Sequence, residues 1–242
     1  MTFPGSHDRL KSEKEELKMI TGYLLLILCV ILVGGWIARK MGAKAVNKFF
    51  AKIHTPIGIL AILLTVLHLV LTHEVWKTRS DAVVGTGIFT AIVMVAMTVV
   101  YYRRKTFGTA WLRYHRIGAL VVVAILISHM VTYFVDYSSY QSKLASIQVQ
   151  GMTAKGVADG KYIGECNVGF IYAKVEVTVQ GEEIQDIQLL EHKNERGKKA
   201  ERLIDEMRQK KTTGVDTVSG ASNSSRVITK AVENALKTTK GK

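Results

Sequence analysis

Four long apolar stretches follow one another along the first part of the chain, near 19–38, 53–73, 82–102 and 117–136. Each is long enough to cross the roughly 30 Å hydrocarbon layer of a bilayer as a helix of about 20 residues. After Tyr140 such stretches stop and the composition becomes that of a soluble domain. The pattern predicts a membrane all-α four-helix bundle over 19–140, after a flexible end at 1–18. A linker at 141–149 and a small α+β domain at 150–242 follow.

Shorter periodicities predict the elements of the soluble domain. Val168–Val179 is rich in β-branched residues, Gln180–Glu182 is typical of a turn, and Ile184–Leu190 returns as a second strand, so a hairpin is predicted. Apolar residues then recur at helical spacing over Ala200–Lys210 and again over about 223–236. Two helices are therefore predicted after the hairpin.

The net charge of +13 is distributed unevenly among the loops. Segments 39–52 and 103–116 each carry five lysines or arginines and no acidic residue, whereas the loop between the second and third stretches carries both signs. Basic residues in alternate loops are the positive-inside signal of a membrane protein. Both basic loops are therefore predicted in the cytoplasm of a cell membrane, with both termini and the soluble domain outside it. Membrane topology explains the charge, and no nucleic-acid partner is predicted.

Two pairs of histidines form the strongest chemical signal. His54 and His68 are 14 residues apart in the second stretch, and His115 and His129 are 14 apart in the fourth. This spacing is close to four helical turns, so each pair lies on one helix face, about 21 Å apart along the axis. The two helices are predicted to run in the same direction, which pairs His54 with His115 and His68 with His129. Imidazole suits iron, and an intramembrane polar residue is by default functional.

The histidine pattern therefore predicts two haems, an inner one at His54 and His115 and an outer one at His68 and His129. The chain has no CxxCH motif for covalent attachment, so the haems are predicted to be of the b type. Gly58 and Gly118 are placed where a porphyrin could approach a helix closely. The alternative is that each histidine only bonds a neighbouring helix. His73 is interpreted as an interfacial residue or an alternative ligand.

The four histidines resemble the haem-carrying core of the ferric reductase-like transmembrane family, which includes the membrane part of NADPH oxidases. The resemblance covers roughly residues 20–137 and implies two b haems held between two helices. Members of that family commonly carry further helices and a cytoplasmic flavin–nicotinamide domain, and this sequence contains neither. Within it, Gly85-Thr86-Gly87 lies in an apolar stretch and is no dinucleotide fingerprint.

Small and hydroxyl-bearing residues surround Gly220 just before the last predicted helix, in the segment Asp216–Ser225. The free amides and the dipole of a helix N-terminus favour an anion such as phosphate. The alternative is an ordinary turn that ends in a side-chain cap of the helix. From these residues alone both interpretations remain open.

Several separated motifs occur in one order: Asp159–Gly164, the hairpin, Leu189–Lys193 and Asp216–Ser222. Together they resemble the FMN-binding domain family found in subunits of Rnf- and Na⁺-translocating NADH:quinone-type complexes, over roughly residues 150–238. The resemblance implies FMN esterified through its phosphate to Ser222 by a flavin transferase outside the cytoplasm, although threonine is the commoner acceptor. It also implies a surrounding cofactor site made of Asp216, Thr217, Ser219, Gly220, Ala221 and Ser225.

Two further residues of the soluble domain are ambiguous. His192 is interpreted as a flavin contact or, more simply, as a surface residue. Cys166 is interpreted as a buried small residue, and it is not expected to form a disulfide with Cys29, which lies in the first apolar stretch.

Together these features predict an oxidoreductase of the flavocytochrome b type, embedded in membrane lipid. Electrons would pass from a cytoplasmic flavoprotein or a quinol through two b haems to FMN and on to an external acceptor. One alternative is a quinol-oxidising subunit of a larger, ion-translocating redox complex, although the four apolar stretches up to residue 135 contain no Asp or Glu. Another is a haem or redox sensor without turnover.

Overall fold

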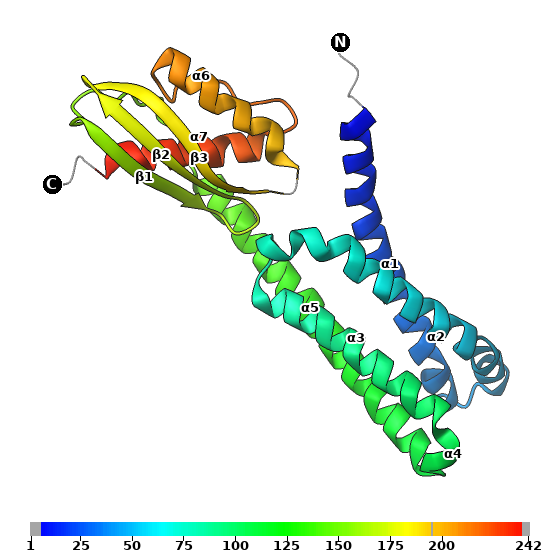
Figure 1. The fold of residues 1–242 in the computed structure, drawn as a ribbon. Helices are drawn as coiled ribbons and strands as arrows, with labels where there is room; N and C mark the ends of the chain where they lie inside the picture. Colours follow the sequence, from blue (N-terminus) through cyan, green and yellow to red (C-terminus); the bar gives the residue numbers. More distant parts are fainter. Residues whose placement is uncertain (1–5, 195, 239–242) are drawn as a thin grey trace. The chain divides into compact units, whose positions relative to one another are not determined.

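The computed structural model describes residues 6–194 and 196–238. Its first part contains four helices that are long and apolar enough to cross a membrane, which confirms the predicted spans. They are α1 (Ser6–Lys40), α2 (Lys44–Thr72), α3 (Asp81–Tyr102) and α5 (Ala110–Ser146). The 3₁₀ helix η1 (His73–Thr78) and the short helix α4 (Arg104–Phe107) lie in the connections (Figure 1). These four helices make the chain a multi-pass membrane protein.

Two of the long helices extend beyond the predicted boundaries. Helix α1 begins at Ser6, inside the segment expected to be flexible, while residues 1–5 lie outside the described residues. Helix α5 continues through the predicted boundary at Tyr140 and ends at Ser146. Hydropathy marks where an apolar stretch ends, and a helix with polar residues can continue past that point.

The chain divides into two compact units. One comprises 81–133 and the described residues up to Trp76; the other comprises 77–80 and the described residues from Phe134 onward. The last turns of α5 therefore belong to the second unit.

The second unit is built on a three-stranded antiparallel sheet in the order β1-β2-β3. The strands are β1 (Gly160–Asn167), β2 (Tyr172–Gln180) and β3 (Glu183–Lys193). Helix α7 (Ser222–Lys237) packs against β1 and β2, and α6 (Leu203–Lys210) packs beside β3 (Figure 1). Every second residue of β2 is at most 1% exposed and forms the core with apolar residues of α7, namely Ala173, Val175, Val177, Val179, Val227, Ile228, Val232 and Leu236. These elements confirm the predicted α+β domain.

The predicted hairpin and the last helix are present. Gly181 and Glu182 connect β2 to β3, and both have positive φ, at 61° and 60°. This conformation gives the turn a twist that suits two antiparallel strands. The predicted helix at 200–210 instead begins as the 3₁₀ helix η2 (Gly197–Arg202) and becomes α-helical only from Leu203.

Strand β1 is absent from the sequence-based prediction. Its buried position is Gly164, where a Cβ atom would lie only 2.1 Å from the backbone oxygen of Ala231 on α7. Helix α7 approaches the strand so closely that a β-branched residue has no room there. The usual sequence signal of a strand is missing for that reason.

Candidate functional site

The predicted inner histidines lie together in the first unit. His54 on α2 and His115 on α5 have ring centroids 5.9 Å apart, with the ring planes at 76°. An imidazole nitrogen binds a metal ion at about 2 Å, so two rings at this separation are within reach of one metal centre. The Nδ1 atom of His115 is buried and has no hydrogen-bond partner among the described residues. The ring of Trp111 lies one helical turn away, 6.1 Å from the His115 ring.

The outer histidines, His68 on α2 and His129 on α5, are held by neighbouring helices. The Nδ1 atom of His68 is 2.9 Å from the Thr21 hydroxyl on α1. The Nδ1 atom of His129 is 3.0 Å from the Thr86 hydroxyl on α3 and 3.0 Å from the backbone oxygen of Val83. The Nδ1 atom of each outer ring is therefore within hydrogen-bond distance of another helix. The spacing of residues in the sequence did not indicate a role for Thr21 or Thr86.

The other residues considered for the membrane site have different surroundings. Gly118 faces Met97, whose Cγ atom would lie 2.6 Å from an added Cβ, so Gly118 serves helix packing. Gly58 has nothing within 4 Å of that position and leaves its face of α2 open. His73 is exposed in η1, with its ring 5.4 Å from that of Trp76. Among the described residues, no three His, Cys, Asp or Glu side chains cluster to hold a bare metal ion.

The predicted attachment residue Ser222 is the first residue of α7 and is exposed. Ala221 occupies the N-cap position and makes no side-chain hydrogen bond to the helix. The interpretation as an ordinary capped turn therefore does not hold, because the cap residue has no polar side chain. The first amides of α7 keep the donors that an anion such as phosphate would use.

The segment before α7 exposes most of the predicted recognition residues. Asp216, Thr217 and Ser219 are exposed, and Gly220 has φ 75°, a conformation that favours glycine. Ser225 differs from them because its side chain is fully buried. Its hydroxyl accepts a hydrogen bond from the Val218 amide and donates one to the Ala221 oxygen, both at 3.0 Å. Ser225 thus shapes the loop, which the sequence motif did not reveal.

An aromatic cluster lies close to Ser222, the predicted attachment residue. The Asn223 side chain, next to Ser222, donates a hydrogen bond of 3.0 Å to the Tyr140 hydroxyl. The Tyr140 ring stacks on Phe170 with centroids 5.0 Å apart and planes at 9°. The Arg79 guanidinium lies 3.7 Å from the centre of the Phe170 ring, a cation–π contact. All of these residues belong to the second unit, namely Arg79, Tyr140, Phe170, Ser222 and Asn223.

His192 is buried in β3, so the surface interpretation of this residue is wrong. Its side chain is 2% exposed, and its Nδ1 atom lies 2.9 Å from Glu201 and 3.2 Å from the Asn194 amide. Its Nε2 atom and the Asn194 Oδ1 atom are buried without partners among the described residues. Cys166 in β1 is only partly buried, and burial raises the pKa of its thiol.

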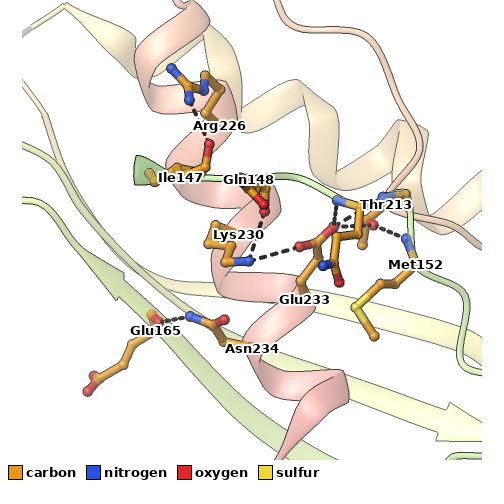
Figure 2. A network of polar contacts seen from close by, with 11 residues as sticks. Ile147, Gln148, Met152, Glu165, Thr213, Arg226, Lys230, Glu233 and Asn234 are labelled. Carbon is orange, nitrogen blue, oxygen red and sulfur yellow. Dashed lines mark hydrogen bonds and ion pairs between the residues drawn. The ribbon is translucent and has the colours of Figure 1, made fainter. Parts of the chain in front are cut away.

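A buried carboxylate ties α7 to the segment that follows α5 (Figure 2). Glu233 is fully buried and accepts hydrogen bonds from the Gln150 amide at 2.6 Å and the Gly151 amide at 3.2 Å. The Thr213 hydroxyl and the Lys230 ammonium group each lie 3.3 Å from this carboxylate. Nearer the start of α7, Arg226 donates to the Ile147 oxygen and Lys230 to the Gln148 oxygen. The segment expected to be a linker is thereby fastened along α7.

A polar pocket of about 370 Å³ opens elsewhere in the second unit. Its charged or aromatic lining residues include Lys77, Glu165, Tyr172, Glu191 and Lys193. The Tyr172 hydroxyl donates a hydrogen bond of 2.8 Å to Glu165, and this bond raises the pKa of Tyr172 to about 12.

Comparison with known proteins identifies the domain family of the second unit. Residues 169–237 match the family of the FMN-binding domain, and the match covers β2, β3, η2, α6 and α7. It includes Ser222 and the whole segment from Asp216 to Ser225. No curated protein matches the chain. The protein therefore joins an FMN-binding domain to four long apolar helices, an arrangement that indicates a role in redox chemistry or electron transfer.

Proposed function

We propose that the protein is a flavocytochrome that transfers electrons across a membrane. Its donor is a cytoplasmic flavoprotein or a quinol, and its acceptor lies on the other side. Two b haems, one for each histidine pair, and one FMN on Ser222 are its redox groups. The two basic loops face the cytoplasm in this proposal, following the positive-inside rule, and the FMN-binding domain lies outside.

The second unit supports attachment of FMN at Ser222. This residue is exposed at the start of a helix whose N-cap, Ala221, has no capping side chain. Residues 169–237 match the FMN-binding domain family. An anion at this position benefits from the helix dipole and the first amides of α7. When bound, FMN supplies exchange of either one or two electrons. A flavin transferase outside the cytoplasm is the partner that would form the ester.

The first unit supports the haems through its histidines. His54 and His115 come from different helices and bring their rings to 5.9 Å. His68 and His129 are each oriented by a threonine on a further helix. Neutral imidazoles at such positions would hold a haem iron, which would supply one-electron exchange. The observation that carries the proposal is this pairing of histidines from α2 and α5.

A difference spectrum of the purified full chain, dithionite-reduced minus oxidised, tests the proposal when haem is quantified per chain. We expect two low-spin b haems. His54→Ala and His68→Ala should each remove one haem, whereas His73→Ala, which alters an exposed histidine of η1, should remove none. A folded, flavin-loaded sample without haem would overturn the proposal and leave a membrane-anchored flavoprotein.

One observation favours a quinol as the donor. An apolar pocket of about 490 Å³ lies between α2 and α3, lined by Ile62, Val95, Thr98, Val99, Tyr102 and Arg103. Its apolar walls suit an apolar ring or chain such as that of a quinol, and Thr98, Tyr102 and Arg103 are its three polar lining residues. Val95→Trp should then slow reduction by a short-chain quinol while leaving reduction by dithionite unchanged. Equal quinol rates in both proteins would favour the cytoplasmic flavoprotein.

A further inference from the structure

We propose that Thr21 and Thr86 are positioning residues, which hold His68 and His129 in the one tautomer that can bind iron through Nε2. This inference rests on the proposed haem binding and deepens it. Each threonine hydroxyl has one hydrogen atom, and the acceptor of that hydrogen decides the direction of the bond between the threonine and the outer histidine.

Thr21 has a single hydroxyl hydrogen, which is already engaged. The hydroxyl donates to the backbone oxygen of Lys18 at 3.0 Å, within α1. It also lies 2.9 Å from the Nδ1 atom of His68, and while its hydrogen is donated to the Lys18 oxygen it accepts from this atom. The hydrogen of that bond therefore belongs to His68 Nδ1. In the neutral ring Nε2 is then the nitrogen with the lone pair, and a lone pair is what a metal ligand needs.

Thr86 gives the same result for His129 by two routes. Its hydroxyl donates to the backbone oxygens of Ala82 at 2.7 Å and Val83 at 3.0 Å, so it accepts from His129 Nδ1 at 3.0 Å. The Val83 oxygen also lies 3.0 Å from Nδ1, and a carbonyl oxygen can only accept. The Val83 contact requires a hydrogen on Nδ1, and the Thr86 hydroxyl agrees with it because its own hydrogen is donated within α3. His129 is therefore fixed in the same tautomer as His68.

A glycine follows each threonine and lets the imidazole lie against the helix. A Cβ atom at Gly22 would be 3.4 Å from His68 Cε1, and one at Gly87 would be 3.2 Å from His129 Cε1. The same Thr-Gly pair thus occurs in α1 against His68 of α2 and in α3 against His129 of α5. Its repetition on two helices, each facing the outer histidine of a neighbour, indicates a shared function.

The inner pair is different. The Nδ1 atom of His115 is buried and has no partner among the described residues, so no acceptor fixes its tautomer there. A ligand that donates its second N–H to an acceptor is more basic and better oriented, and loss of the acceptor typically lowers metal affinity about 10- to 100-fold. A more basic ligand favours the oxidised iron. We therefore expect the outer haem to have the lower reduction potential.

The test uses the full chain and the variants Thr21→Val and Thr86→Val, which keep the shape and remove the acceptor. Thr90→Val is the matched control, because Thr90 also donates to its own helix, at the Thr86 oxygen. Haem content per chain and an equilibrium redox titration followed by absorption are measured for each. We expect Thr21→Val to lower affinity for one haem by about 10- to 100-fold and to raise one of two potentials. Thr86→Val should act in the same direction but less, because the Val83 oxygen still accepts from His129 Nδ1. A tenfold preferential loss of ferric affinity corresponds to about 59 mV.

The outcomes separate the two proposals. Thr21→Ser and Thr86→Ser retain a hydroxyl and should restore the wild-type potentials, which a purely steric role would not require. If the wild-type chain binds two haems but the valine variants match Thr90→Val in both readouts, the positioning role is overturned and haem binding stands. If the folded wild-type chain binds no haem, the proposed function itself is overturned.

Discussion

The Ser225 hydroxyl accepts a hydrogen bond of 3.0 Å from the Val218 amide and donates one to the Ala221 oxygen, and so closes the loop that presents Ser222. Ser225→Ala would leave the buried Val218 amide without this partner, at a cost of about 1–3 kcal/mol. We expect lower thermal stability and incomplete flavin attachment. Ser222→Ala removes an exposed hydroxyl and should change stability by only about 0.5 kcal/mol or less. Equal unfolding temperatures for the two variants would contradict the role assigned to Ser225.

Loss of the Ser222 hydroxyl should abolish covalent flavin. An ester needs an oxygen at this position, and Ser222 is the exposed hydroxyl residue at the start of α7. Flavin fluorescence on a denaturing gel should disappear in Ser222→Ala and persist in the control Ser222→Thr, both coexpressed with a flavin transferase. A fluorescent band in Ser222→Ala would show that the flavin is attached to another residue.

The Glu233 carboxylate should contribute strongly to the stability of the second unit. Glu233→Leu leaves the amides of Gln150 and Gly151 without their acceptor, so we expect a loss of about 3 kcal/mol or more. Glu233→Gln keeps one acceptor oxygen and should lose about 1 kcal/mol. Hydrogen exchange of β2 peptides in the full chain measures both, with Glu182→Gln in the exposed turn as the control. Similar exchange in all three variants would show that the buried network adds little.

Packing of His129 on α3 should depend on Gly87. A Cβ atom there would come within 3.2 Å of the ring, whereas one at Gly85, two residues earlier on the same helix, would have nothing within 4 Å. Gly87→Ala should therefore displace the ring and reduce the haem content of the purified chain, while Gly85→Ala should leave it unchanged. Full haem content in Gly87→Ala would mean that the ring can shift without losing its ligand position.

The Tyr172 hydroxyl should lose its proton at a higher pH than an ordinary tyrosine. Its hydrogen bond to Glu165 raises the pKa from the ordinary value near 10 to about 12 in the folded chain. Because the folded pKa is the higher one, the stabilisation is fully present below about pH 10 and is lost as the pH rises through 12. The phenolate absorbance of wild type minus Tyr172→Phe should therefore rise near pH 12, and Glu165→Gln should move this rise downward. A rise near pH 10 in the wild type would contradict the hydrogen bond.

Local patterns in the sequence predicted the helices and strands whose formation depends on residues close together in the chain. The apolar stretches gave the four helices because a bilayer sets their length, and the β-branched run from Val168 gave the hairpin. The 14-residue spacing of the histidines within each of two helices, with the predicted parallel direction of those helices, led to the pair His54 and His115 that lies together in the structure. The capping alternative for α7 failed because the N-cap falls on Ala221 rather than on a hydroxyl residue.

Contacts between residues far apart in the chain could not be predicted from the sequence. Thr21 and His68 are 47 residues apart, and Thr86 and His129 are 43 apart, so no periodicity connects them. Strand β1 carries Gly164 where α7 leaves no room for a side chain. His192 is buried because Glu201 and Asn194 supply polar partners within the fold, although a histidine among charged residues resembles a surface position.

The fastening of residues 147–151 along α7 bears on how Ser222, the proposed attachment residue, is held. Asn223, beside Ser222, bonds Tyr140 of α5, while Arg226 and Lys230 hold the backbone that leaves that helix. A carrier on a loose tether would sample many positions, and its rate of exchange would follow the length of the tether. Here these bonds join the start of α7 to the last turns of α5 and the backbone that follows them, within the second unit. A group bound at Ser222 would keep its place within the second unit instead of swinging on a loose segment.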